Sequence, residues 1–241
     1  MAQANSKIIP LPQRARTESR APAGIRLRPY LIFAFLVAIS VVLAAADLIT
    51  LALDTAFGSV QLREAFNVDE EQSIPTWFSS IQLFAASLLV VLIAWLDEHR
   101  RSQHARYWWF LAAILLVLSV DEVVGFHENG SLVLKNLGVG GDWVVLGAVV
   151  AAVVGIAFIP FLLVLPRQIT ALFICGGVLL LSGALAVEVW DLSILDEEKT
   201  FLLGLVPATE EFLERLGISV FILGLLIYMR EHLGLRGLVL N

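Results

Sequence analysis

The sequence contains one cysteine, Cys175, and four histidines. A lone cysteine excludes an intrachain disulfide, a CxxC redox pair and a metal site built from several thiolates of one chain. The chain has neither a GxxxxGK[S/T] loop nor a GxGxxG motif, which argues against a nucleotide cofactor. Only 16% of its residues are charged, whereas an ordinary soluble domain has about 25%. The composition therefore excludes a typical soluble protein, and no nucleic-acid partner is expected.

Long apolar runs account for most of the chain, which is 59% hydrophobic. A run of about 18 or more apolar residues is long enough to cross the ~30 Å hydrocarbon core of a membrane. The runs predict an all-α polytopic membrane protein, a bundle of about six transmembrane helices within residues 30–230. Residues 1–29 are predicted to form a disordered basic tail, and residues 231–241 a short second tail. The predicted spans are Tyr30–Leu53, Ile74–Leu96, Tyr107–Glu128, Trp143–Leu165, Ile169–Trp190 and Leu202–Met229.

The distribution of basic residues predicts the orientation of the bundle. Twelve Lys and Arg residues lie in the two tails and in the loops around 97–106 and 167, and three lie in the opposite loops. Cytoplasmic loops carry the excess of basic residues, so both termini are expected to be cytoplasmic, in a bacterial inner membrane. The segment 96–104, LDEHRRSQH, is predicted to be a solvated cytoplasmic loop. Tryptophans and tyrosines at the span ends are expected to be interfacial anchors.

Acidic residues gather at one depth of the predicted bundle. The segment 115–131, LLVLSVDEVVGFHENGS, begins as an apolar span and then carries four ionisable residues within eight positions. A helical rise of about 1.5 Å per residue places Asp121 and Glu122 about 21–23 Å from the cytoplasmic edge. Spans five and six bring further acids to the same outer half of the bilayer. His127 joins this layer only if the helix loosens near Gly125 or ends at the segment 127–130, HENG.

Each carboxylate at the centre of a membrane costs about 2.5–3.5 kcal/mol and less near the interface, so seven or eight of them, discounted for depth, cost on the order of 10–20 kcal/mol. Arg215 and His127 cannot neutralise them all, and a divalent cation or partial protonation would supply the missing positive charge. The donor set of many carboxylates and one imidazole favours Mg, Ca, Mn, Fe or Zn over copper. A plain helical ion pair between Glu211 and Arg215 is the structural alternative for those two residues. The candidate metal ligands are Asp121, Glu122, His127, Glu128, Glu188, Asp191, Glu211 and Glu214, and the candidate catalytic residues are Glu122, Glu210 and Arg215.

Two short motifs carry resemblances to known families. The segment 210–215, EEFLER, resembles the EExxxR motif of the CAAX-protease and bacteriocin-processing membrane proteases, which implies an intramembrane protease. That family has histidine motifs in later spans, whereas only His232 follows here. The paired pattern S-x-D-E…H-E and E-E-x-x-E-x-x-G, the latter from Glu210 to Gly217, is similar to that of uncharacterised bacterial multi-pass membrane proteins. This resemblance implies six or so spans and a shared acidic site, but no activity.

Three kinds of function remain open on these observations. The first is a metal-dependent membrane enzyme that acts on a lipid-like substrate, with a metal-bound water or a redox metal as the reactive group. The second is a proton- or cation-coupled transporter or channel, although the cytoplasmic half of the bundle has few polar residues. The third is a non-catalytic membrane subunit. Membrane lipids and a lipid-like or ionic substrate are the expected partners, and a homo-oligomer or a larger membrane complex is left open.

Overall fold

The computed structural model describes residues 24–58, 61–68, 70, 72–126, 143–187, 200–235 and 237–239. Six of its helices are long and apolar enough to cross a membrane, which confirms the predicted all-α, six-span architecture. A short helix α2 (Gln61–Phe66) follows the first span, and α7 continues into a π-helical segment η1 (Ser182–Val187). The six long helices are α1 (Pro29–Phe57), α3 (Ile74–His99), α4 (Ala105–Val124), α6 (Trp143–Val164), α7 (Arg167–Leu181) and α9 (Thr200–Glu231).

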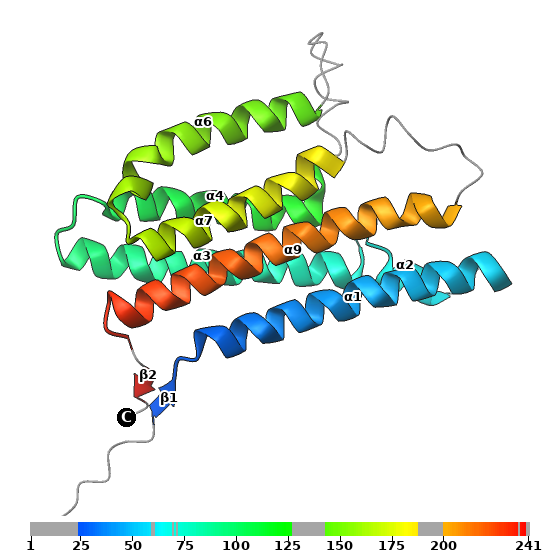
Figure 1. The fold of residues 1–241 in the computed structure, drawn as a ribbon, viewed down its shortest axis with the longest axis horizontal. Helices are drawn as coiled ribbons and strands as arrows, with labels where there is room; N and C mark the ends of the chain where they lie inside the picture. Colours follow the sequence, from blue (N-terminus) through cyan, green and yellow to red (C-terminus); the bar gives the residue numbers. More distant parts are fainter. Residues whose placement is uncertain are drawn as a thin grey trace, which may run out of the picture.

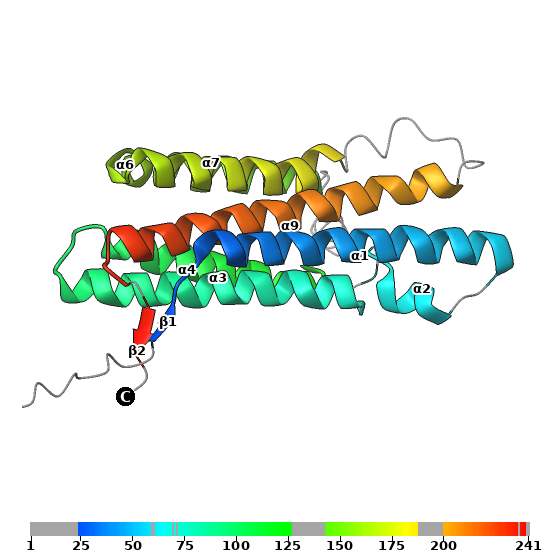
Figure 2. The same ribbon diagram turned by 60° about the horizontal axis from the view of Figure 1, so that its bottom comes forward.

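The long helices run roughly along one axis and lie in three layers. Helices α6 and α7 form one layer, α1 and α9 the middle one, and α3 and α4 the third (Figures 1 and 2). Helix α9 packs against α1, α3, α7 and η1. Two-thirds (67%) of its most apolar window is buried, compared with 11–44% for the other spans. Helix α9 is therefore the central helix, and the residues it carries face the interior of the bundle.

Helices α7 and α9 approach each other through glycines. A Cβ atom added to Gly176 would lie 2.8 Å from the carbonyl oxygen of Gly217, and one added to Gly217 would lie 2.6 Å from the carbonyl oxygen of Gly176. Lipid tails are as apolar as leucine, so membrane helices associate largely through close packing, which small residues permit. The two glycines therefore set the distance between the central helix and α7.

Helices α3 and α4 are held together by hydroxyl groups. Ser80 donates a hydrogen bond to the carbonyl oxygen of Ser119 at 2.8 Å, and Ser119 donates to the carbonyl oxygen of Ser80 at 2.9 Å. About two helical turns further along α3, Ser87 donates to the carbonyl oxygen of Ala112 at 2.9 Å. In hydrocarbon these hydroxyls have no water as an alternative partner, so they fix the register of the two helices. The apolar core lies between these helices and α9, and includes Val90, Ile93 and Leu225.

The described ends of the chain meet at one end of the bundle. Strand β1 (Gly24–Arg26) pairs antiparallel with β2 (Gly237–Val239), with Gly24 opposite Val239 and Arg26 opposite Gly237. The sequence pattern does not predict this pairing, because both segments lie in the predicted tails. The rest of the N-terminal tail lies outside the described residues. The strand pair links the start of α1 to the end of α9.

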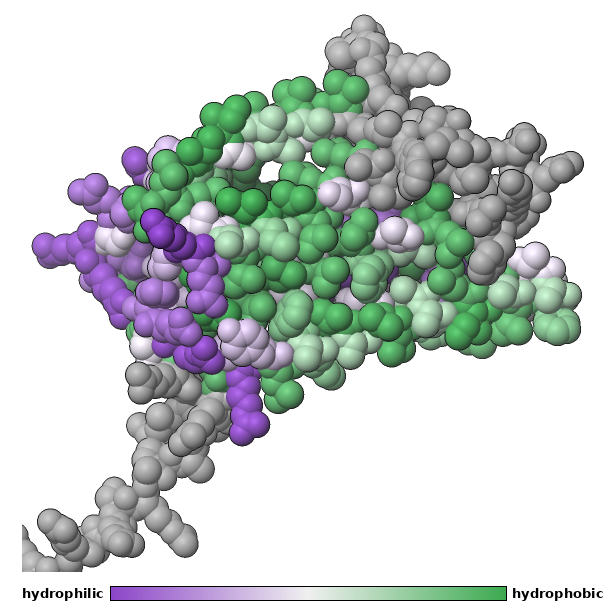
Figure 3. Space-filling view, in the orientation of Figure 1, coloured by the Kyte–Doolittle hydropathy of each residue, from purple (hydrophilic) through white to green (hydrophobic). Residues whose placement is uncertain are grey.

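The surface separates into an apolar belt and a polar end (Figure 3). Large apolar side chains such as Phe35, Val153 and Leu163 are exposed along the belt, as expected for residues that face lipid tails. The polar end is the one that carries β1 and β2, and exposed arginines gather there. They are Arg28, Arg100, Arg101, Arg106 and Arg167.

Part of the predicted loop at 96–104 is helical instead. Helix α3 continues to His99, and Asp97 is buried with an exposed fraction of 7%. Arg100 and Arg101 are exposed, as the loop prediction required. The interpretation of the whole segment as solvated was therefore wrong at Asp97, because the neighbouring helices cover the last turn of α3.

The substitution Gly176→Ala is expected to lower the melting temperature of the protein in detergent. The added methyl would lie 2.8 Å from the carbonyl oxygen of Gly217, and overpacking of this kind costs about 1–3 kcal/mol. Gly177→Ala is the matched control, since nothing lies within 4 Å of a Cβ atom at that position. Equal destabilisation by the two substitutions, measured by thermal unfolding, would contradict the close contact between α7 and α9.

Candidate functional site

Carboxylates from α4 and α9 gather around a single arginine. Glu122, in the last turn of α4, lies within electrostatic reach of Glu211 and Arg215 on α9. Glu214 lies within reach of Glu122, Glu211 and Arg215. We call Glu122, Glu211, Glu214 and Arg215 the acidic cluster. It carries three carboxylates and one guanidinium inside the bundle.

Arg215 uses only part of its hydrogen-bonding capacity. Its side chain is fully buried, and Nη1 donates to Oε2 of Glu211 at 2.9 Å. The same nitrogen lies 3.5 Å from the hydroxyl of Ser79 on α3. Among the described residues, neither Nε nor Nη2 of Arg215 has a hydrogen-bond partner. These two nitrogens form the edge of the guanidinium that binds a carboxylate or phosphate through two parallel hydrogen bonds.

Helix α3 supplies a polar wall to the cluster. Ser79 lies beside the carboxylate of Glu122. Gln82 donates from Nε2 to the hydroxyl of Ser219 at 3.0 Å, and Ser219 donates to the carbonyl oxygen of Arg215 at 2.8 Å. The sequence pattern assigns no role to these residues. The available signal was Gln82, the one amide side chain in the predicted second span.

The π-helical segment η1 lies against the carboxylate-bearing face of α9. A Cβ atom added to Gly183 would lie 2.7 Å from Cγ of Glu214 and 2.7 Å from the carbonyl oxygen of Glu210. Only a glycine therefore allows η1 to lie so close to Glu214. Single π-helical turns inside α-helices occur frequently at functional sites. Together, α3, α4, η1 and α9 surround the acidic cluster.

The remaining predicted site residues fall into two groups. Asp121 lies close enough to act on the charge of Glu122, and Glu210 on that of Glu214, so both border the cluster. The other predicted residues, His127, Glu128, Glu188 and Asp191, lie outside the described residues. Helix α4 ends at Val124, and Gly125 adopts the left-handed conformation with φ 61°. The helix is thus interrupted at Gly125, and such an interruption is the condition under which His127 is predicted to join the acidic layer.

Asp47 of α1, another acid inside a span, belongs to a different contact. It is fully buried and forms an ion pair with Arg63 of α2. The backbone N–H of Val68 donates to the same carboxylate at 3.2 Å. Arg63 also donates to the side-chain oxygen of Asn67 at 2.6 Å. Asp47 therefore ties α2 to α1, and its charge has its own counterion.

The described residues contain no group of three or more His, Cys, Asp or Glu side chains arranged to hold a metal ion. Four of the eight predicted ligands lie outside the described ranges. The carboxylates of the acidic cluster therefore do not form a metal site by themselves in this structure, and the predicted site, which includes four residues outside the described ranges, stays a prediction. What the described residues do show is an excess of partly buried carboxylates over cationic groups at the acidic cluster.

The fold and the site define an integral membrane protein of six long helices with an acidic cluster buried between them. The chain belongs to the family described as Domain of unknown function (DUF8692), whose model matches residues 33–229. This match covers the six long helices almost completely and assigns no activity to them. No curated protein and no solved structure matches the chain. The resemblance to CAAX-processing proteases at residues 210–215 stays a prediction.

Arg215→Met is expected to destabilise the protein, by up to about 3–5 kcal/mol, because it removes the fully buried cation that pairs with the partly buried Glu211. Arg230→Met is the matched control on the same helix. Arg230 pairs with Glu231 at 2.7 Å, but both side chains are partly exposed, and exposed pairs contribute about 0–1 kcal/mol. The double substitution Glu211→Gln with Arg215→Met should recover part of the loss. Similar melting temperatures for the two single variants would show that Arg215 does not neutralise the cluster.

Proposed function

We propose that this protein binds a divalent cation at the acidic cluster and acts there on a lipid-like substrate that carries an anionic group. One observation carries the proposal: among the described residues, Glu122, Glu211 and Glu214 share a single arginine, and Glu211 already pairs with it. A buried carboxylate without a counterion costs several kcal/mol in hydrocarbon. A bound divalent cation would remove that cost. Carboxylate oxygens are the ligands that hard divalent cations prefer.

The unused edge of Arg215 supports an anionic substrate group. Nε and Nη2 are buried and have no partner among the described residues, and unpaired charged donors are costly in a membrane interior. A phosphate or carboxylate group would pair with both nitrogens. A substrate that reaches this depth from the membrane has to be largely apolar, so an acidic lipid or a lipid phosphate is the fitting class. Arg215 would then hold the anionic group beside the cation, and Glu122 and Glu210 remain the candidate catalytic acids.

The apolar core favours a site open to one side over a route through the membrane. From Ser219 to Tyr228, α9 carries nine residue steps, about 14 Å of helix, in which the described side chains are apolar. On α3, Ser87 is the one polar residue between Gln82 and Asp97, and its hydroxyl is bonded to the carbonyl oxygen of Ala112. A transporter would need a continuous polar path between the two ends. The packed core supports an enzyme more than a transporter.

The distribution of arginines supports cytoplasmic termini in a bacterial inner membrane. The end of the bundle that carries β1 and β2 also carries the exposed arginines (Figure 3). By the positive-inside rule this end would face the cytoplasm. The acidic cluster would then lie in the outer half of the bilayer. A lipid of the outer leaflet is the substrate that this orientation favours.

The wild-type protein, purified in detergent and incubated with Mn²⁺ or Zn²⁺ before dialysis, is expected to retain about one divalent ion per chain. The double variant Glu122→Gln with Glu214→Gln should lose most of this metal, because it removes two carboxylates from the cluster. Glu64→Gln is the control, since Glu64 is exposed on α2 and is not among the charges that act on Glu122 or Glu214. Elemental analysis measures the number of metal ions bound per chain. A wild-type protein that retains no ion would contradict the proposed cation site.

The orientation is tested with single cysteines in a Cys175→Ser background. Gln72→Cys lies just before α3, and Gln103→Cys lies in the loop between α3 and α4; both residues are exposed. In sealed right-side-out vesicles, a membrane-impermeant maleimide is expected to label position 72 and to label position 103 only after permeabilisation. The reverse pattern would place the arginine-rich end outside.

A further inference from the structure

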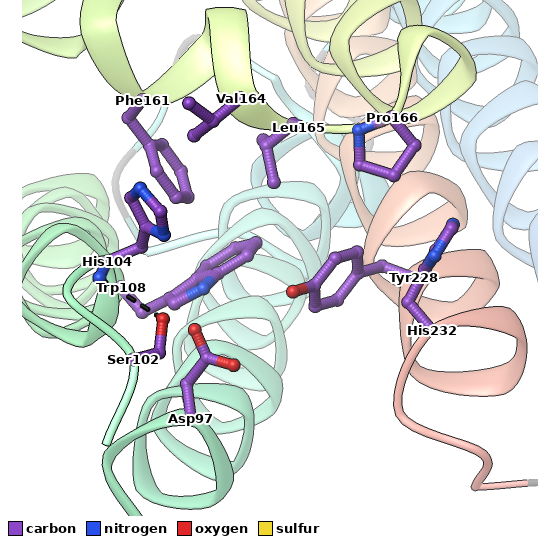
Figure 4. A pocket seen from close by; sticks show the side chains of 10 residues that line it. All are labelled: Asp97, Ser102, His104, Trp108, Phe161, Val164, Leu165, Pro166, Tyr228 and His232. Atoms are coloured by element: carbon purple, nitrogen blue, oxygen red, sulfur yellow. Dashed lines mark hydrogen bonds between the residues drawn. The ribbon is translucent and has the colours of Figure 1, made fainter. Parts of the chain in front are cut away.

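A second site lies at the opposite end of the bundle from the acidic cluster. The ends of α3, α4, α6 and α9 line a cavity of about 230 Å³. Its lining combines aromatic rings with one carboxylate, that of Asp97, and also includes the imidazoles of His104 and His232 (Figure 4). Ligand pockets for drug-sized molecules measure about 300–1,000 Å³. This cavity therefore fits a smaller group, of the size of a lipid headgroup.

Three polar groups converge in this cavity without bonding to one another. The carboxylate of Asp97, the hydroxyl of Tyr228 and the indole nitrogen of Trp108 point toward the same region (Figure 4). Trp108 is fully buried, and its Nε1–H has no hydrogen-bond partner among the described residues. Asp97 is 7% exposed, and within the described chain its carboxylate takes part in no hydrogen bond or ion pair. Buried polar groups are normally paired, so this arrangement indicates a missing partner.

The charge of Asp97 selects a cationic partner. The nearest arginine along the chain, Arg100, lies within electrostatic reach of Tyr228, but its Nη2 donates to the carbonyl oxygen of Leu233 at 3.2 Å and not to Asp97. A positively charged ligand group would pair with the carboxylate. The rings of Trp108 and Tyr228, whose centroids are 5.1 Å apart, would add the attraction of aromatic faces for a cation. These features together match an ammonium group.

The surroundings of the cavity select a phosphate next to that ammonium. Arg106 and Arg167 do not line the cavity, but they follow the lining residues His104 and Pro166 within two positions, and both are exposed at this end of the bundle. Phosphates are bound by arginine guanidiniums. The unpaired indole N–H of Trp108 also needs an oxygen acceptor. An ammonium beside a phosphate is the chemistry of phosphoethanolamine.

The depth of the cavity matches the headgroup region. Asp97, Trp108 and Tyr228 all lie within three residues of a helix end, which is within about 5 Å of that end. Tryptophan and tyrosine are enriched at this level of a membrane. We infer that this cavity binds the phosphoethanolamine headgroup of a membrane lipid, with Asp97 pairing with the ammonium.

The inference is tested on the full-length protein in detergent by native mass spectrometry with added lipids. Phosphatidylethanolamine should bind, and N-acylated phosphatidylethanolamine, which keeps the phosphate but lacks the ammonium, should bind at least about tenfold more weakly. Asp97→Asn should weaken phosphatidylethanolamine binding by a similar factor. Glu98→Gln is the matched control: it removes the same charge one residue away, from an exposed side chain that accepts a hydrogen bond from Trp109 at 3.1 Å. This variant should bind as the wild type does.

Several results would overturn the inference. Equal binding of the two lipids by the wild type would show that no ammonium is recognised, whether or not Asp97→Asn folds. Equal weakening by Asp97→Asn and Glu98→Gln would show a general charge effect. Free phosphoethanolamine provides the last comparison. If it stabilises the wild type but not the Asp97→Asn variant, while the lipid does not bind, then the ligand is a soluble one and the lipid assignment is wrong.

Discussion

Hydrocarbon cannot solvate charge, and this constraint determines how the bundle is organised. Every ionisable side chain within the spans has to find a counterion, a proton or a bound ion inside the protein. Asp47 meets the requirement through Arg63 of the neighbouring α2. Among the described residues the acidic cluster meets it only in part, since Arg215 serves three glutamates. This difference distinguishes the structural ion pair of Asp47 from the cluster at which we propose a further cation.

The central position of α9 makes the fold and the site depend on the same helix. Its glycines bring α7 close, while Glu211, Glu214 and Arg215 form most of the acidic cluster. Gly183 of η1 contacts the helix at Glu214, so the packing of the two elements also sets the space around that carboxylate. A shift of α7 along α9 would therefore alter the site, because packed helix interfaces transmit small displacements.

The six spans could be predicted because an apolar run has to be as long as the hydrocarbon is thick. Helix α3 begins at the predicted Ile74, whereas α1 continues from the predicted Leu53 to Phe57. The contacts within the site were harder to predict. The bond between Gln82 and Ser219 joins residues 137 positions apart, and helix rotation and tilt, which no local pattern encodes, decide such pairings. The cavity beside Asp97 was not predicted, because Trp108 and Tyr228 have the sequence pattern of interfacial anchors. Asp97 has the sequence pattern of a solvated loop.

The antiparallel pairing of β1 with β2 has a mechanical consequence. Within the strand pair, the two residues nearest the chain termini are Gly24 and Val239, and they lie opposite each other. A force that pulls the termini apart would load the pair from one edge and open its backbone hydrogen bonds one at a time. Such unzipping resists much less force than shearing, in which all the bonds carry load together. Tension on the tails would be released there first, before it reached α1 and α9.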